Sequence, residues 1–315
     1  MDKKIIDDIV WYIPFKKLRN ALRNYLYFLI DTNQLKQDIN DINNTISNLY
    51  RDTMYFNRII SEYHINMLLK LPKYSNEKRL ERYGFQVYSQ NEEDGMINEI
   101  FKRIGTTNKF FIEFGVQSGL ESNTHFLLFN GWKGIFIEGS EGYYKQILNN
   151  FKEPIKNKKL TVLNKFITAE NINDIINSTE AYKINDIDLL SIDIDGNDYH
   201  VFKAIDVINP RVVVIEYNTK FPPPSEYIMP YDPEYCWDYT DIQGASLQSL
   251  TKLANEKGYS LVATTLTGVN AFFVKNELIE DKFCDVNDVQ ALHNPYRHRC
   301  ITFYKGIENK YYLDH

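Results

Sequence analysis

The sequence has few cysteines and no long apolar run. Its three cysteines, Cys236, Cys284 and Cys300, lie far apart and in no metal-ligand spacing, which excludes a disulfide framework and a cysteine-based zinc site. No apolar stretch reaches the ~18–20 residues that cross a bilayer, and no signal peptide with a small-residue cleavage site is visible. We therefore expect a cytoplasmic protein that neither spans a membrane nor is secreted.

Positive charge is also scarce. The chain has 36 Lys and Arg against 42 Asp and Glu, for a net charge of −6. A nucleic-acid binder that relies on bulk positive charge is therefore excluded. Of the 315 residues, 43% are apolar and 14% aromatic, so the chain is not disordered and can build one core of ~200 residues plus an appendage.

Residues 1–80 are predicted to form a separate helical region. Residues 5–30 combine aromatic and basic side chains, and a helix beginning after Pro14 would place its leucines on one stripe with the basic residues off it. Such an amphipathic helix suits packing against the protein itself, or a peripheral contact with the inner, anionic face of a membrane. Both interpretations stay open.

A heptad pattern follows. Between its apolar positions stand mostly Asn, Asp, Gln and Ser, so the apolar stripe is the surface that gains by burial. The pattern predicts a long helix over about residues 33–71, ended by Pro72, that pairs with a second copy in a homo-oligomer or folds back onto the body. The stripe consists of Leu35, Ile39, Ile42, Ile46, Leu49, Thr53, Phe56, Ile60, Tyr63 and Met67.

The body, residues 81–280, alternates short apolar runs with amphipathic stretches. Such runs are typical of strands buried on both faces, hence of a parallel sheet flanked by helices. Two further runs, 259–265 and 270–275, are only four residues apart and predict an antiparallel pair at one edge. We expect an α/β, Rossmann-like, doubly wound sheet of seven strands, followed by a tail over 281–315. The first five strands are predicted at 110–114, 134–138, 160–166, 188–193 and 211–217.

Ligands of such sheets bind at the carboxyl ends of the strands. The first strand leads into Glu113, Gly115 and Gly119, whose glycines let the backbone turn tightly and approach a ligand. The second ends at Glu138, where a carboxylate can accept both hydroxyls of a ribose. Because the dinucleotide fingerprint is absent and Glu113 would repel a phosphate, a cationic nucleoside such as S-adenosylmethionine fits better than NAD.

Acidic residues gather after the fourth and fifth strands. Asp193, Asp195 and Asp198 would be costly to bury unless paired or metal-bound. Glu216 and Asn218 end the neighbouring strand, and the oxygens of the two strand ends would together suit Mg²⁺ or Mn²⁺. The metal ligands are therefore predicted among Asp193, Asp195, Glu216 and Asn218, whereas a turn at 195–197 with no metal is the alternative.

A proline-rich loop comes next, because five of the ten prolines lie within residues 222–233. A long ordered loop above the strand ends is placed to form the wall of an acceptor site. A contact between subunits is the alternative.

Taken together, these segments resemble the FkbM-like group of S-adenosylmethionine-dependent methyltransferases. Residues 195–199 also look like the metal-binding strand of macrolide sugar O-methyltransferases. The resemblance covers about residues 85–278 and implies O-methyl transfer, often to a sugar or polyketide hydroxyl; a glycan precursor is the acceptor we expect. The matching segments are 89–95, 111–116, 122–124, 134–140, 190–199, 214–218 and 270–274.

The predicted roles follow from this reading. One group is expected to hold the donor: Glu113, Gly115, Gly119, Glu138, Gly139 and Ser140. A second is expected to close over the donor's amino-acid end: Gln90, Asp94, Asn123 and Thr124. Proton transfer is assigned to a third: Asp195, Asp198 and His200.

Two other functions fit parts of the pattern. Asp193-Ile194-Asp195 is a D-x-D sequence, the pair with which many glycosyltransferases hold a metal and a nucleotide diphosphate. A non-catalytic assembly protein that acts through the heptad helix is the other alternative, although the acidic cluster favours an enzyme.

Overall fold

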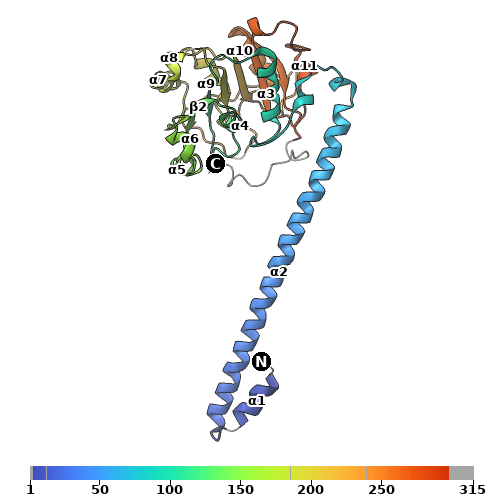
Figure 1. Cartoon of the computed structure of the whole chain (residues 1–315), viewed down its shortest axis with the longest axis vertical. Coiled ribbons are helices and arrows are strands. Elements are labelled where there is room, and N and C mark those ends of the chain that lie inside the picture. Colours follow the sequence, from blue (N-terminus) through green and yellow to red (C-terminus); the bar gives the residue numbers. More distant parts are fainter. Residues whose placement is uncertain (1–2, 12, 185, 239, 298–315) are drawn as a thin grey trace. The chain divides into compact units, whose positions relative to one another are not determined.

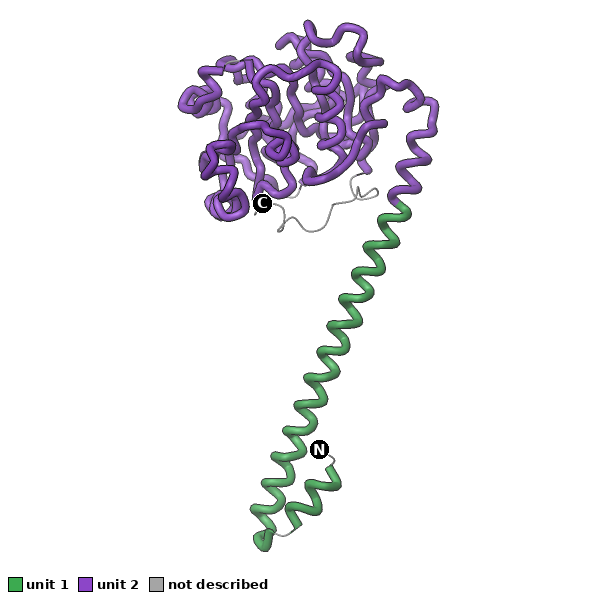
Figure 2. Tube along the Cα trace, viewed as in Figure 1, with its two compact units in different colours: residues 1–60 green, residues 61–315 purple. Residues whose placement is uncertain are grey.

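The computed structural model describes residues 3–11, 13–184, 186–238 and 240–297. The chain divides into two compact units, residues 1–60 and residues 61–315 (Figure 2). Among the described helices, none is both long and apolar enough to cross a bilayer. Most of the predicted tail, from residue 298 onward and with it Cys300, lies outside the described residues.

Unit 1 consists of α1 (Lys3–Trp11) and most of α2 (Lys16–Leu69), which lie side by side at the start of α2 (Figure 1). Ile6 and Val10 of α1 are fully buried, and Arg23 donates to Asp7 at 2.6 Å. Because no proline or glycine interrupts it, α2 is one helix rather than a short helix followed by a separate heptad helix from about residue 33. The membrane contact of residues 5–30 stays a prediction.

Unit 2 is built on a seven-stranded sheet in the order β3-β2-β1-β4-β5-β7-β6. The first five strands are parallel, and β7 pairs antiparallel with both β5 and β6. The predicted doubly wound sheet and its antiparallel edge are confirmed, with strand ends shifted by at most two residues. The strands are β1 (Phe110–Phe114), β2 (Lys133–Glu138), β3 (Leu160–Asn164), β4 (Leu189–Ile192), β5 (Val212–Glu216), β6 (Tyr259–Thr264) and β7 (Asn270–Lys275).

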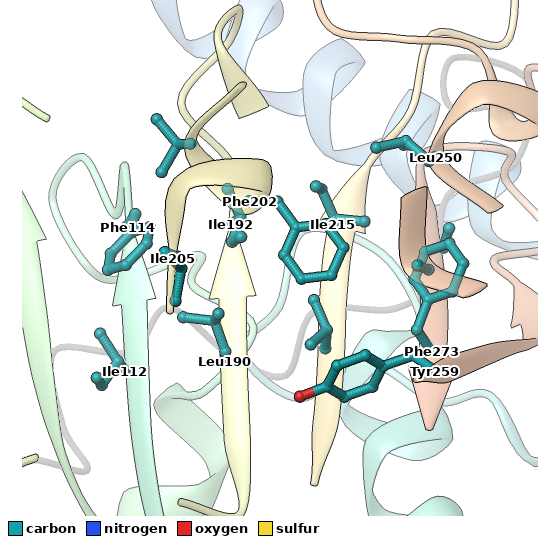
Figure 3. Packing of buried hydrophobic residues seen from close by; sticks show 14 of the residues in the cluster. Ile112, Phe114, Leu190, Ile192, Phe202, Ile205, Ile215, Leu250, Tyr259 and Phe273 are labelled. Carbon is teal, nitrogen blue, oxygen red and sulfur yellow. The ribbon is translucent and has the colours of Figure 1, made fainter. Parts of the chain in front are cut away.

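Helices cover both faces of the sheet, so the protein has two cores. Because side chains alternate along each strand, successive residues of one strand enter different cores. Ile112 and Phe114 of β1 point into one core, shown in Figure 3, whereas Phe111 points into the other. The first core is covered by α7 (Ile172–Asn177), α8 (Ala181–Ile184), α9 (Asp198–Ala204), α10 (Leu247–Glu256) and α11 (Val289–Leu292). The second is covered by α3 (Glu93–Ile104), α4 (His125–Phe129) and α5 (Glu141–Asn150), with α6 (Lys152–Lys156) beside α5.

Short 3-10 helices connect α2 to the body and follow the last strand. They are η1 (Pro72–Tyr74), η2 (Leu80–Tyr83) and η3 (Asn276–Leu278). Because β1, β2, β4 and β5 run parallel, their carboxyl ends meet at one edge of the sheet, where the predicted site residues lie.

Candidate active site

A cavity of about 960 Å³ opens at the carboxyl ends of β1, β2, β4 and β5. This volume lies within the usual range for small-molecule sites. Its lining includes Gln90 from the loop before α3 and predicted residues from all four strand ends: Gly115, Glu138, Gly139, Ser140, Asp193, Asp195, Glu216 and Asn218. The geometry of the sheet thus brings these strand-end residues to one cavity, and their roles stay predictions.

Three carboxylates form one cluster in this cavity. Asp193, Asp195 and Glu216 each offer an oxygen within 4.8 Å of the others. They converge because β4 and β5 are adjacent and parallel, so the residues just after each strand meet. Asp195 has φ +56°, a left-handed conformation that costs energy in most residues and tends to occur at functional sites.

The cluster is electrostatically strained. Burial first, and then the charges of Glu216 and Asp195, raise the pKa of Asp193 well above its usual value. Burial likewise raises the pKa of Glu216, with Asp198 and Asp195 adding to the effect, and it raises the pKa of Asp195. A cation among the three carboxylates would favour their ionised forms, so the donor set fits a hard divalent ion.

Asn218 lies beside the cluster but its side chain already has partners. Its amide nitrogen donates to the carbonyls of Asp241 and Gln243, each at 3.0 Å, and its oxygen accepts from the Lys220 N–H at 3.1 Å. Asn218 therefore fastens the loop of residues 219–243, and its role as a metal ligand stays a prediction.

The turn after β1 requires glycine. A Cβ on Gly115 would lie 1.6 Å from the carbonyl oxygen of Asp193, and Gly115 has φ +69°. Gly119 has φ +77°, and its Cβ would meet Phe151 at 2.6 Å. Gly115 thus lets the ends of β1 and β4 approach each other, whereas Gly119 lets the turn pack on the body.

Glu138 lies on the wall of the cavity at the end of β2. Its two oxygens accept from the N–H groups of Gln117, at 2.8 Å, and of Ser140, at 2.7 Å. Each oxygen keeps a second lone pair, so the carboxylate is held in place and can still accept from a ligand's hydroxyls. The Ser140 side chain caps α5 by accepting from the Tyr143 N–H, and Gly139 packs against Phe166.

A smaller cavity of about 90 Å³ adjoins Glu113 and Asn123. Glu113 accepts from the N–H groups of Asn123 and Thr124 at 2.8 and 3.0 Å, which ties this loop to β1. Burial raises the pKa of Glu113 to about 7. Glu113 and Thr124 are thus occupied within the protein, while Asn123 donates from its amide to Ser191.

Two buried oxygens on this smaller cavity have no hydrogen-bond partner among the described residues, the hydroxyl of Ser122 and the amide oxygen of Asn270. The amide nitrogen of Asn270 donates to Glu93 at 2.9 Å, which fixes its oxygen as the free end. Buried polar atoms are normally satisfied. These acceptors therefore fit the ammonium group of an amino-acid ligand.

Asp94 lines neither cavity but orders the loop that does. Its carboxylate accepts from the N–H groups of Val87, Tyr88 and Ser89 at 2.7 to 3.0 Å and is almost fully buried. It thereby shapes the loop that brings Gln90 to both cavities.

Two predicted catalytic residues do not line either cavity. Asp198 begins α9 and accepts from the N–H groups of Ile194 and Gly196, each at 2.9 Å, while a ring nitrogen of His200 lies 2.8 Å from the Met229 carbonyl oxygen. Their positions give no support to a direct catalytic role. The start of α9 turns both side chains toward backbone partners, which sequence spacing alone did not reveal.

Several cavity residues were missed from the sequence. Gln117, Phe166, Tyr235 and Trp237 line the larger cavity. Phe166 follows β3, so the strand-end rule could have found it. Tyr235 packs against Gly196, whose Cβ would lie 2.5 Å from the Tyr235 ring, and no local pattern indicates that contact.

Part of the chain matches a known family model. Residues 164–235 match the model of the methyltransferase FkbM domain. This segment is therefore similar to the FkbM methyltransferases. The FkbM segment contains β4, β5 and the first part of the 219–243 loop, and with them Asp193, Asp195, Glu216 and Asn218. Over this segment the match agrees with the resemblance that the sequence suggested.

Solved structures similar to this chain include methyltransferases. The glycopeptide N-methyltransferase MtfA complexed with sinefungin is 13% identical, with 58% of this chain and 86% of that chain covered and a TM-score of 0.37. A putative caffeoyl-CoA O-methyltransferase from Staphylococcus aureus is 12% identical, with 58% and 82% covered and a TM-score of 0.37. At these scores the similarity supports no conclusion about activity. No curated protein matches the sequence.

Proposed function

We propose that this chain transfers a methyl group from S-adenosylmethionine to a hydroxyl oxygen of a sugar or glycan precursor, assisted by Mg²⁺ or Mn²⁺. The observation that carries the proposal is the meeting of a glycine turn, a positioned carboxylate and a three-carboxylate cluster around one cavity. The family match favours methyl transfer over glycosyl transfer by the D-x-D pair.

The donor side is formed by β1 and β2. Glu138 is positioned to accept from ribose hydroxyls, Gly115 lets a ligand approach the backbone, and the free oxygens of Ser122 and Asn270 suit an ammonium group. S-adenosylmethionine supplies a methyl group on a positively charged sulfur. The surrounding carboxylates suit that charge, whereas a diphosphate would meet repulsion.

The metal side is formed by β4 and β5. Asp193, Asp195 and Glu216 would hold the ion, and a bound divalent cation makes a nearby hydroxyl more acidic. Of the predicted proton acceptors Asp195 alone lines the cavity, so we assign it the proton of the acceptor hydroxyl. The remaining task of the protein is to hold donor and acceptor in line, which supplies much of the acceleration in such transfers.

The acceptor side is the 219–243 loop. Tyr235 and Trp237 line the cavity there, and Trp237 is 41% exposed. Flat aromatic side chains beside polar groups form a surface that suits a sugar ring. Asn218 also lines this cavity, and its side chain fastens the loop.

The donor assignment is tested by calorimetry with S-adenosylmethionine. Glu138→Ala should weaken binding at least tenfold, because two ribose hydroxyls lose their acceptor. Glu141→Ala serves as the matched control, since Glu141 is an exposed carboxylate whose partner is Lys145 on the surface of α5. Equal affinity of Glu138→Ala and the unchanged protein would remove the donor assignment.

The metal assignment is tested by direct Mn²⁺ binding, followed by calorimetry or electron paramagnetic resonance. Asp195→Asn should lower Mn²⁺ affinity at least tenfold while keeping the backbone, because asparagine tolerates a positive φ as aspartate does. Asp174→Asn, on the exposed side of α7, should change nothing. If EDTA leaves methyl transfer intact and Mn²⁺ does not bind, the metal part fails while the methyltransferase stands.

A further inference from the structure

A continuous apolar seam runs along α2, longer than the heptad pattern that the sequence showed. From Leu18 the positions advance by three and four residues without a break as far as Met67. We call these positions the seam: Leu18, Ala21, Tyr25, Phe28, Thr32, Leu35, Ile39, Ile42, Ile46, Leu49, Thr53, Phe56, Ile60, Tyr63 and Met67. Seven heptads in one register are the pattern of a coiled coil.

The seam is open to solvent. Its large apolar side chains are all exposed, Phe28 to 65%, Ile46 to 57% and Leu49 to 60%. The helix α1 leaves them exposed. Its Asp7 bonds to Arg23 and Tyr27 and its Lys3 pairs with Asp31, and these three residues of α2 lie off the seam. An exposed apolar surface of this length marks an interaction site, and its heptad spacing suits another helix.

We propose that the seam pairs with the same seam of a second copy, as a parallel two-stranded coiled coil. Counting Leu18 as position a, the a positions are mostly β-branched, with Ile39, Ile46 and Ile60 among them. The d positions hold mainly residues that branch at Cγ rather than at Cβ, such as Leu35 and Leu49. Branching at a with leucine at d favours parallel dimers over trimers and tetramers.

The flanking charges select the same arrangement. In a parallel pair, Asp31 lies beside Lys36 of the other copy, and no pair of like charges faces across the seam. In an antiparallel pair that overlaps along the full helix, Asp52 instead lies beside Asp31 or Asp38. Three aspartates on one flank and a lysine on the other therefore favour the parallel orientation.

The first test is the size of the full chain by light scattering after gel filtration. We expect twice the chain mass of 37.2 kDa. Ile46→Asp at an a position should convert the dimer to monomer, whereas Asn44→Asp adds the same charge on the outer face and should keep the dimer. A monomer for the unchanged chain, a trimer or tetramer, or a dimer that survives Ile46→Asp overturns the proposal.

The second test is orientation. With Cys236, Cys284 and Cys300 changed to serine, Leu35→Cys should form a disulfide between copies on mild oxidation, because equal d positions face each other in a parallel pair. Gln37→Cys on the outer face should not. A dimer in which Leu35→Cys fails to cross-link overturns the parallel arrangement. Circular dichroism of each variant shows whether the helix and the body remain folded.

Discussion

Glu113 and Glu92 are carboxyl groups that the fold holds away from water. Burial raises the pKa of Glu113 to about 7 and that of Glu92 to about 8, from an ordinary 4.5. The folded protein therefore binds protons that the unfolded chain has released above pH ~5. Stability from these groups is present at low pH and is lost as the pH rises through their folded values.

We accordingly expect the melting temperature of the metal-free protein to fall between pH 5 and pH 8. For Glu113 the loss is on the order of 3 kcal/mol by linkage. Glu113→Gln, which imitates the protonated acid, should flatten the slope, and thermal unfolding across this pH range measures it. A slope unchanged in Glu113→Gln, or stability that rises with pH, would contradict the assignment.

At the residue scale, the sequence predicted the position of some cavity residues and not of others. Asp193, Asp195 and Glu216 follow from the strand-end rule, because that rule depends only on where parallel strands stop. Asp198 and His200 do not line the cavity, since the first turn of α9 rotates them toward backbone partners. Asn270 escaped notice because its free oxygen is apparent only once Glu93 is seen to bind its nitrogen.

At the scale of elements, the site depends on how close the carboxyl end of β1 lies to the carboxyl end of β4. Gly115 sits where its missing Cβ leaves room for the Asp193 carbonyl, and Asp193 begins the carboxylate cluster. The separation of the two strand ends therefore sets both the proposed donor turn and the proposed metal ligands.

Gly115→Ala should destabilise the protein by at least ~3 kcal/mol and abolish donor binding, because a backbone clash adds to the cost of positive φ. Gly131→Ala is the matched control. Gly131 is exposed and has φ +77°, but its Cβ would meet nothing within 4 Å, so this variant should cost only ~1 kcal/mol. Urea unfolding and calorimetry measure both. Equal losses for the two alanines would show that the clash relaxes freely.

Strand boundaries in the body were predictable to within two residues, because each strand is a short apolar run bounded by polar residues. The continuity of α2 was not. Residues 16–30 of α2 and its heptad region carry different compositions, and the sequence suggested two elements where one helix exists. Composition changes along α2, while nothing in its backbone chemistry stops the helix.

At the scale of the whole molecule, the two units have different surfaces. Unit 2 buries its apolar residues in two cores on the faces of the sheet, whereas unit 1 leaves a seam exposed. The sequence predicted both features, because a parallel sheet and a heptad helix have distinct periods. The sequence placed a wall of the acceptor site at residues 222–233, whereas the loop residues that line the cavity include Tyr235 and Trp237, just beyond that stretch. Their position depends on how a long loop returns over Gly196.

The 219–243 loop is one contiguous stretch of chain, and the donor-side groups Gly115 and Glu138 lie outside it. Asn218 fastens it at its base through two carbonyls near its far end. Under the proposed function, substitutions confined to this one loop can therefore change which molecule is methylated. The residues that bind the methyl donor need not change with them.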